Sequence, residues 1–113
     1  MKKMNYKDLK NNLEEVLSTQ ATSYDYLDTI EYLIDKCYHF GADNVEIDAH
    51  DNLYVTKGKA DYFPCVVSHT DTVHDIYKGY EVIESKGNFF GFCNKKMEQV
   101  GVGGDDKVGI WVC

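Results

Sequence analysis

The sequence is poor in positive charge and lacks any long apolar run. Its 12 lysine and arginine residues are outnumbered by 19 aspartate and glutamate residues, so the formal net charge is −7 at pH 7. The basic residues form no extended patch, which argues against a nucleic-acid partner. No apolar segment approaches a membrane span or follows the N-terminal lysines as in a secretory leader. We therefore predict a cytoplasmic protein that binds neither nucleic acid nor membrane.

Closely spaced cysteines are also absent. Cys37, Cys65, Cys93 and Cys113 lie far apart, and the sequence has no Cys-x-x-Cys pair. This spacing argues against a disulfide scaffold and against a zinc ribbon. The cysteines are therefore predicted to be free thiols that pack as small apolar side chains.

What the sequence does contain is enough apolar surface for one small domain, beginning with two helices. Apolar residues make up 43% of the 113 residues. Asn5 and Asp8 form an N-cap pair ahead of apolar residues at helical spacing, and Thr22 and Asp25 repeat the capping signature before a second apolar stripe. We expect Gly41 to end the second helix.

The hydrophobic period then changes from about 3.6 to 2, which indicates strands. Residues 45–49 and 53–56 alternate around a turn and predict a β-hairpin with one buried face. Asp48, His50 and Asp51 have the composition of a metal cluster. Their place beside the turn instead favours ordinary turn chemistry.

Three further segments are expected after this hairpin. Residues 65–68 are apolar without alternation, which predicts a strand buried on both faces, as in the parallel centre of an α/β sheet. Residues 80–84 and 88–92 predict a second hairpin. Residues 93–99 predict a mobile polar segment.

A first polar motif follows the predicted buried strand. His69 and Asp71 lie just beyond its carboxyl end, where open α/β sheets bind their ligands. Residues two apart in an extended segment face the same way, so Asp71 can accept the imidazole N–H opposite a metal-binding nitrogen. His69, Asp71 and His74 also have the composition of an iron facial triad. No histidine follows His74 to act as the distant ligand of such enzymes.

A second motif lies near the C-terminus. Gly103 and Gly104 precede the adjacent acids Asp105 and Asp106, and an apolar, helical run begins at once. Such a turn can bring the backbone close to a ligand while the first acid points into the site. A phosphate-binding loop does not fit, because Lys107 is neither preceded by glycine nor followed by serine or threonine.

Together the two motifs resemble the metal motifs of peptidase family M20. Residues 67–73, Val-Ser-His-Thr-Asp-Thr-Val, are similar to the first motif of its co-catalytic zinc aminopeptidases and carboxypeptidases. Residues 103–109, Gly-Gly-Asp-Asp-Lys-Val-Gly, are similar to the second, in the form of the peptidase T branch. The resemblance implies an α/β fold in which residues 1–113 form a single partial catalytic domain. That domain would be the N-terminal part of a phosphorylase/hydrolase-like three-layer structure, with two leading helices and then a mixed sheet.

The resemblance also implies a site that holds two Zn²⁺ ions. His69 would ligate one ion, and Asp71, as a catalytic residue, would hold the His69 imidazole in the correct tautomer. Asp105 would bridge the two ions. The structural residues of the site would be Gly103, Gly104 and Asp106, the last after a peptide bond that is cis in relatives. In the family the ions share a water, a glutamate takes its proton, and the hydroxide attacks a peptide carbonyl.

The sequence departs from the family pattern after Asp105. Relatives continue with a Glu-Glu pair, another acidic ligand and a distant histidine, but the eight residues after Asp105 include neither glutamate nor histidine. A zinc site needs about three or four protein ligands, and the motifs supply two. We therefore expect little or no peptidase activity from this chain alone.

The predicted function is that of an N-terminal fragment of a dinuclear zinc aminopeptidase with tripeptidase-like activity toward peptides. A complementary C-terminal chain would complete the site, and either that chain or a second copy would cover the apolar residues Ile110, Trp111 and Val112. The alternative is a non-catalytic binding or regulatory protein that keeps the peptidase-like fold and acts through protein–protein contact.

Overall fold

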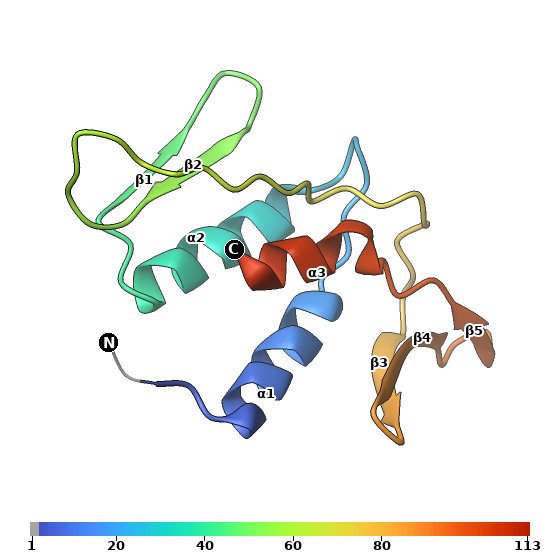
Figure 1. Cartoon of the computed structure of the whole chain (residues 1–113). Coiled ribbons are helices and arrows are strands. Elements are labelled where there is room, and N and C mark those ends of the chain that lie inside the picture. The colour runs from blue at the N-terminus through green and yellow to red at the C-terminus, as the bar shows by residue number, and fades with distance from the viewer. Residues whose placement is uncertain (1–2) are drawn as a thin grey trace. The chain divides into compact units, whose positions relative to one another are not determined.

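The fold was analysed in a computed structural model that describes residues 3–113 (Figure 1). Its elements are α1 (Tyr6–Leu17), α2 (Leu27–His39), β1 (Asn44–Ile47), β2 (Leu53–Thr56), β3 (Tyr80–Ser85), β4 (Asn88–Cys93), β5 (Glu98–Val100) and α3 (Gly104–Val112). The chain is therefore a mixed α/β protein, in agreement with the predicted class. None of the helices in residues 3–113 is long and apolar enough to cross a membrane.

The backbone divides into two compact units. One unit joins the chain up to Tyr26 with Val66–Cys113, and the other is Leu27–Cys65. Both motifs lie in the first unit, which holds α1, α3 and the three-stranded sheet β3-β4-β5. The second unit holds α2 and the β1-β2 hairpin.

In the second unit, the end of α2 confirms the predicted role of Gly41. Its φ of +86° is left-handed, where glycine carries no Cβ penalty. The Gly41 N–H donates to the Tyr38 carbonyl at 3.0 Å, and the Ala42 N–H donates to the Cys37 carbonyl at 2.9 Å. This pair of bonds is a Schellman motif, and it satisfies carbonyls that the helix end leaves open.

The β1-β2 hairpin forms where it was predicted, and Asp48 closes its turn. The Asp48 carboxylate accepts the backbone N–H groups of His50 and Asn52, each at 2.9 Å, and the Tyr54 hydroxyl at 3.2 Å. The hydrogen bonds from Asn52, first among these contacts, lower the pKa of Asp48 to about 2. Asp48 therefore closes the turn, in line with the turn chemistry that the sequence favoured.

The predicted buried face of this hairpin was wrong. Ile47 and Val55 both keep 46% of their surface exposed. Within this unit α2 packs against β1, and a single short helix beside one strand cannot cover a whole hairpin face.

In the first unit, α1 packs against α3 (Figure 1). The Asn5 side chain accepts the Asp8 N–H at 2.9 Å, which confirms the predicted N-cap. Near the same end of α1, the Trp111 indole N–H donates to the Leu9 carbonyl at 3.1 Å. Val16 and Leu17 bring the buried face of α1 into the core of the unit.

The second capping signature did not mark a helix start. The Thr22 hydroxyl accepts the N–H groups of Tyr24 and Asp25 at 3.3 and 3.0 Å, and the Thr22 N–H donates to the Asp25 carbonyl at 2.9 Å. These bonds close a turn, and α2 begins only at Leu27. Threonine side chains close such turns with the same geometry that caps a helix.

The second hairpin is confirmed, and it extends to a third strand. Lys86 and Gly87 have φ values of 53° and 80°, as a two-residue hairpin turn requires. The prediction of a mobile segment over residues 93–99 was wrong, because Cys93 ends β4 with 1% exposure and Glu98–Val100 forms β5. The first two residues of β5 are polar because they are exposed to solvent, which is why the sequence did not indicate a strand there.

The predicted buried strand over residues 65–68 was also wrong. This segment belongs to neither sheet, and Val66 and Val67 are 72% and 86% exposed. Apolar composition favours a strand, but a strand also needs a neighbour for its backbone groups. Both sheets of residues 3–113 are antiparallel, so the predicted mixed sheet and its parallel centre are absent from that part of the chain.

Within residues 3–113, none of the four cysteines forms a disulfide. Their packing follows the prediction only in part, because Cys93 is buried while Cys65 and Cys113 are exposed.

Candidate metal centre

The first motif is fastened to the chain just after α1. The Thr72 N–H and hydroxyl both donate to the Ala21 carbonyl, at 2.9 and 3.1 Å. Ala21 itself is buried, with 2% exposure. This anchor fixes the segment that carries His69 and Asp71, although the segment forms no strand.

The two motifs meet at His69. The His69 Nε2 atom lies 3.0 Å from Asp105 Oδ1, across 36 positions of the sequence. The His69 Nδ1 atom lies 3.0 Å from the Asp71 carbonyl oxygen and 3.2 Å from Asp71 Oδ1. The other carboxylate oxygen of Asp71 accepts the Ser23 hydroxyl at 3.0 Å. Asp71 therefore holds one ring nitrogen of His69, and Asp105 faces the other.

This arrangement places a hydrogen-bond acceptor at each nitrogen of the His69 ring. A carbonyl oxygen and an ionised carboxylate only accept hydrogen bonds, whereas a neutral imidazole carries a single N–H. A neutral ring that donates to Asp71 thus leaves its Nε2 lone pair facing the Asp105 carboxylate. The contact is satisfied either by an imidazolium or by a cation held between Nε2 and the carboxylate.

The surroundings shift the pKa of His69 upward. Partial desolvation, the largest effect, lowers this pKa. The hydrogen bonds to the Asp105 side chain and to the Asp71 backbone, with the negative charges of both acids, together outweigh it. The His69 side chain is 53% exposed, so solvent screens these interactions.

The donor set at this contact suits zinc. Imidazole nitrogen and carboxylate oxygen bind Zn²⁺ at about 2.0–2.2 Å, so two ligands of one tetrahedral ion lie about 3.3 Å apart. The observed 3.0 Å between His69 Nε2 and Asp105 Oδ1 is close to that spacing. Within residues 3–113 no group of three His, Cys, Asp or Glu side chains converges on one point. The residues present therefore fit as two ligands of a zinc site and not as a complete one.

The two adjacent acids of the second motif have side chains that contact different partners. The Asp105–Asp106 peptide bond is cis, as the family resemblance implies. Asp105 is directed to His69, and its side chain is 94% exposed. Asp106 turns the other way, and its Oδ1 accepts the Gly109 N–H at 3.1 Å, so it caps the regular part of α3.

Gly109 has a role that the sequence pattern did not reveal. A Cβ at this position would lie 2.2 Å from Asp106 Oδ1. Gly109 therefore leaves room for the carboxylate that caps the helix. The pattern Asp-Lys-x-Gly, with an acid three residues before a glycine at the start of a helix, is the signal that could have identified it.

Gly103 allows the two motifs to approach each other. It has a φ of +69°, and a Cβ there would lie 2.8 Å from the Thr72 methyl group and 3.0 Å from Lys107 Cε. The neighbouring Gly104 differs, because a Cβ at 104 would meet only an ordinary contact with Val108 at 3.8 Å. Packing therefore requires glycine at 103 and not at 104.

His74, the third residue of the alternative iron triad, packs elsewhere. A Cβ at Gly101 would lie 2.2 Å from its ring atoms, so the His74 imidazole lies directly over that glycine. It joins no group of three metal-ligating side chains among the described residues.

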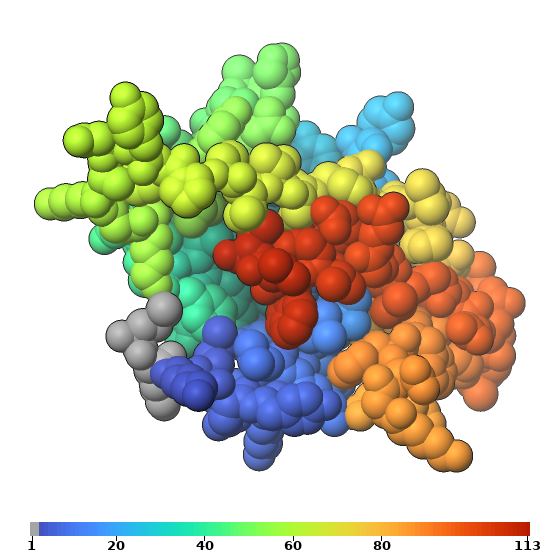
Figure 2. All heavy atoms as spheres, viewed as in Figure 1, coloured from blue at the N-terminus to red at the C-terminus, as the bar shows by residue number. Residues whose placement is uncertain are grey.

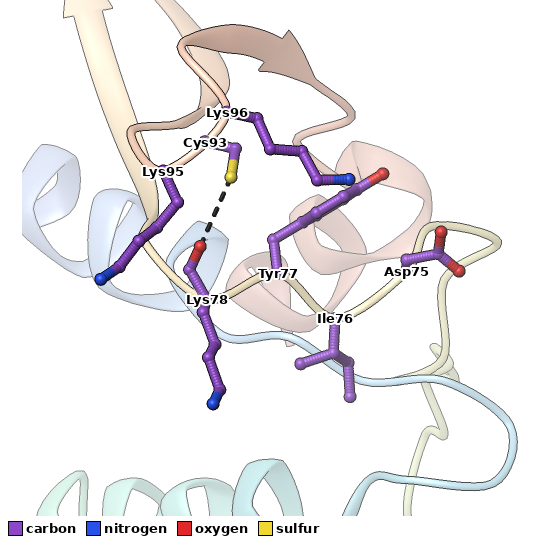
Figure 3. A pocket seen from close by; sticks show the side chains of 7 residues that line it. All are labelled: Asp75, Ile76, Tyr77, Lys78, Cys93, Lys95 and Lys96. Carbon is purple, nitrogen blue, oxygen red and sulfur yellow. Dashed lines mark hydrogen bonds between the residues drawn. The ribbon is translucent and has the colours of Figure 1, made fainter.

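A separate hollow of about 640 Å³ lies beside the three-stranded sheet (Figure 3). Its lining residues are Asp75, Ile76, Tyr77, Lys78, Cys93, Lys95 and Lys96. The Lys96 ammonium lies 5.0 Å from the centre of the Tyr77 ring, and Figure 3 shows the other two lysines pointing away from it. No residue of either motif lines this hollow.

Comparison of the chain with protein-family models, curated proteins and solved structures found no match. The likeness to family M20 therefore rests on the two motifs.

Proposed function

We propose that this chain carries the first half of a dinuclear zinc centre in an M20-type aminopeptidase that acts on short peptides such as tripeptides. One observation carries the proposal: His69 Nε2 lies 3.0 Å from Asp105 Oδ1 while Asp71 holds the opposite ring nitrogen. Zinc-binding histidines almost always donate their other ring N–H to a carboxylate, a carbonyl or a water, as His69 can to Asp71, and this leaves the opposite nitrogen for the metal.

Each motif residue has a defined task in this proposal. Asp71 accepts the Nδ1–H of His69, so the Nε2 lone pair is free to bind a metal. The exposed Asp105 carboxylate would be a ligand of both ions. When bound, zinc would polarise the peptide carbonyl and lower the pKa of a water molecule. A complementary chain would bring the remaining ligands and the glutamate that takes the proton from this water.

The proposal extends to the fold. In a complete phosphorylase/hydrolase-like domain, residues 65–68, which form no strand in this structure, would gain neighbouring strands and enter a mixed sheet. Its exposed Val66 and Val67 support this, because two adjacent valines on opposite faces suit a strand covered on both sides.

Reconstitution tests this function. The chain would be mixed with a C-terminal segment of an M20 tripeptidase that carries the Glu-Glu and histidine motifs, and zinc-dependent hydrolysis of a tripeptide would be followed. We expect activity in the mixture and in neither part alone, with loss of activity for Asp105→Ala. Asp75→Ala, which removes an exposed acid outside both motifs, is the matched control. A mixture that forms a complex and binds zinc but cleaves no peptide would contradict the proposal.

A second candidate function is a non-catalytic binding protein, which the surface of α3 favours. Ile110 and Trp111 are half-buried, but Val108 and Val112 are 42% and 72% exposed. In Figure 2 the atoms of α3, in red, lie at the surface. This candidate predicts a dimer or heterocomplex that persists in EDTA and weakens for Val112→Asp. A monomer at all concentrations that captures no partner would exclude it.

A further inference from the structure

Lys107 is a buried cation whose hydrogen-bond acceptors are backbone carbonyls. The residue is 3% exposed, and its ammonium donates to the Leu17 carbonyl at 3.0 Å and to the Val102 carbonyl at 3.1 Å. Burying a charge costs free energy unless hydrogen bonds compensate for it. These two hydrogen bonds therefore offset part of the cost of burying the Lys107 ammonium.

Tyr80 binds the same two carbonyls. Its hydroxyl donates to Leu17 at 2.9 Å and lies 3.4 Å from the Val102 oxygen. The Lys107 ammonium also lies 5.3 Å from the centre of the Tyr80 ring, within the range of a cation–π contact. The two side chains thus form one polar cluster, which we call the Lys107–Tyr80 pair.

The two carbonyls bound by the Lys107–Tyr80 pair belong to different segments of the chain. Leu17 is the last residue of α1, where helix carbonyls lack a partner within the helix. Val102 immediately precedes Gly103, the left-handed residue at which the second motif begins. The pair therefore ties the end of α1 to the backbone that leads into Asp105.

The first motif is fastened to the same stretch. Thr72 donates twice to the Ala21 carbonyl, four residues beyond Leu17. The stretch from Leu17 to Ala21, at and just beyond the end of α1, thus anchors both segments: Thr72 bonds to Ala21, and Lys107 bonds to Leu17. His69 and Asp105, which approach to 3.0 Å, each lie within three residues of one of these attachments.

We infer that Lys107 and Tyr80 are positioning residues that hold the Asp105 turn against His69. Both side chains hydrogen-bond to the Val102 carbonyl, so their action would pass through that carbonyl and the Gly103 turn. That Lys107 and Tyr80 affect zinc binding rests on the proposed function. That they hold the Asp105 turn in place does not.

The test compares Lys107→Met and Tyr80→Phe with Trp111→Phe. Methionine keeps the length and loses the donor, and Tyr80→Phe removes the second donor to the same carbonyls. Trp111→Phe is the control, because it also removes a hydrogen bond between α3 and a carbonyl of α1 but at the far end of α3. Zinc affinity is measured by titration calorimetry, and amide hydrogen exchange is measured in zinc-free protein at Lys107 and Gly109, whose N–H groups bond to Gly103 and Asp106.

We expect Lys107→Met to weaken zinc binding by roughly 10- to 100-fold, as changes behind a metal ligand do, and to speed exchange at those two amides more than at the amides of α1. Tyr80→Phe should act in the same direction with a smaller effect, and Trp111→Phe should alter neither measurement. If Lys107→Met does not fold, Tyr80→Phe decides by the same two measurements.

Unchanged local exchange in folded Lys107→Met, or equal changes in Trp111→Phe, would overturn the inference. Failure of the wild-type chain to bind zinc would instead count against the proposed function, and exchange in the zinc-free protein would still decide whether the pair positions the turn.

Discussion

At the scale of single residues, the candidate centre depends on the unequal partners of the His69 ring. Asp71 contacts Nδ1 through both its backbone and its side chain, whereas Asp105 contacts Nε2 through one carboxylate oxygen. The Nδ1 partner, Asp71, is only two positions after His69, so this contact is local in the sequence. The Nε2 partner, Asp105, is brought to His69 by the tertiary structure. A substitution at Asp105 can therefore change this contact without changing the local contact at Nδ1.

Replacing Asp105 by asparagine should lower the pKa of His69 in zinc-free protein. The variant removes the negative charge that raises this pKa at Nε2 and replaces a charged hydrogen-bond acceptor with a weaker neutral one, while it leaves the Asp71 contacts in place. Imidazole resonances followed by NMR as a function of pH measure the shift. Asp75→Asn is the control. A His69 pKa that is the same in Asp105→Asn and in wild type would show that the two side chains do not meet in solution.

The sign of the linked effect on stability follows from the direction of the shift. Because the pKa of His69 is raised in the folded state, its contribution is fully present below the ordinary value of 6.5 and is lost as the pH rises through the folded value. The His69 side chain is half exposed, so this contribution is small.

At the scale of elements, the glycines of the second motif differ in what they allow. Gly103→Ala should destabilise the protein by about 1–3 kcal/mol, because alanine must adopt a left-handed φ and its Cβ must displace the Thr72 methyl group. Gly104→Ala should change the free energy of unfolding by less than about 0.5 kcal/mol. Urea denaturation of the two variants measures the difference. Equal losses would contradict the assignment of separate roles to the two glycines.

Most elements could be predicted from local pattern. The N-cap of α1, the Gly41 end of α2 and the two hairpins depend on residues close together in the sequence, and they formed as predicted. The strand over residues 65–68 failed because a strand depends on distant neighbours that composition does not specify. The sheet strand β5 was missed because an exposed three-residue strand carries no apolar alternation.

The sequence identified the side chains that meet at the candidate site, but it did not identify the residues that support them. His69, Asp71 and Asp105 stand out because histidine and carboxylates in short motifs suggest metal chemistry. Lys107 was visible in the sequence only as a charge in a polar turn. Lys107 is buried because Leu17 and Val102, which are far apart in the sequence, come together around its ammonium group. A local sequence pattern cannot predict that a lysine will lie against two carbonyls and a tyrosine ring.

At the scale of the whole molecule, the buried Lys107–Tyr80 pair links stability to alkaline pH. Burial lowers the pKa of Lys107 to about 8 and raises the pKa of Tyr80 to about 12. The Lys107 contribution is present above 10.5 and is lost as the pH falls through about 8. The Tyr80 contribution is present below 10 and is lost as the pH rises through about 12.

The free energy of unfolding of the wild type should therefore rise relative to Lys107→Met between pH 7.5 and 10. A pKa lowered from 10.5 to about 8 corresponds to at most about 3 kcal/mol. Urea denaturation of both proteins at the two pH values measures this change, and the comparison removes effects of net charge that the two share. Stability curves that run parallel across this range would show that Lys107 is not buried in the folded protein.

The most direct test of the candidate centre is a zinc titration of the wild-type chain followed through its imidazole NMR resonances. Of the four histidines, His69 alone should shift saturably, while His39, His50 and His74 serve as internal controls. Asp105→Ala should weaken this response by more than the roughly 10- to 100-fold caused by changes behind a ligand. An unshifted His69 ring, or an undiminished response in Asp105→Ala, would contradict a zinc site at the meeting point of the two motifs.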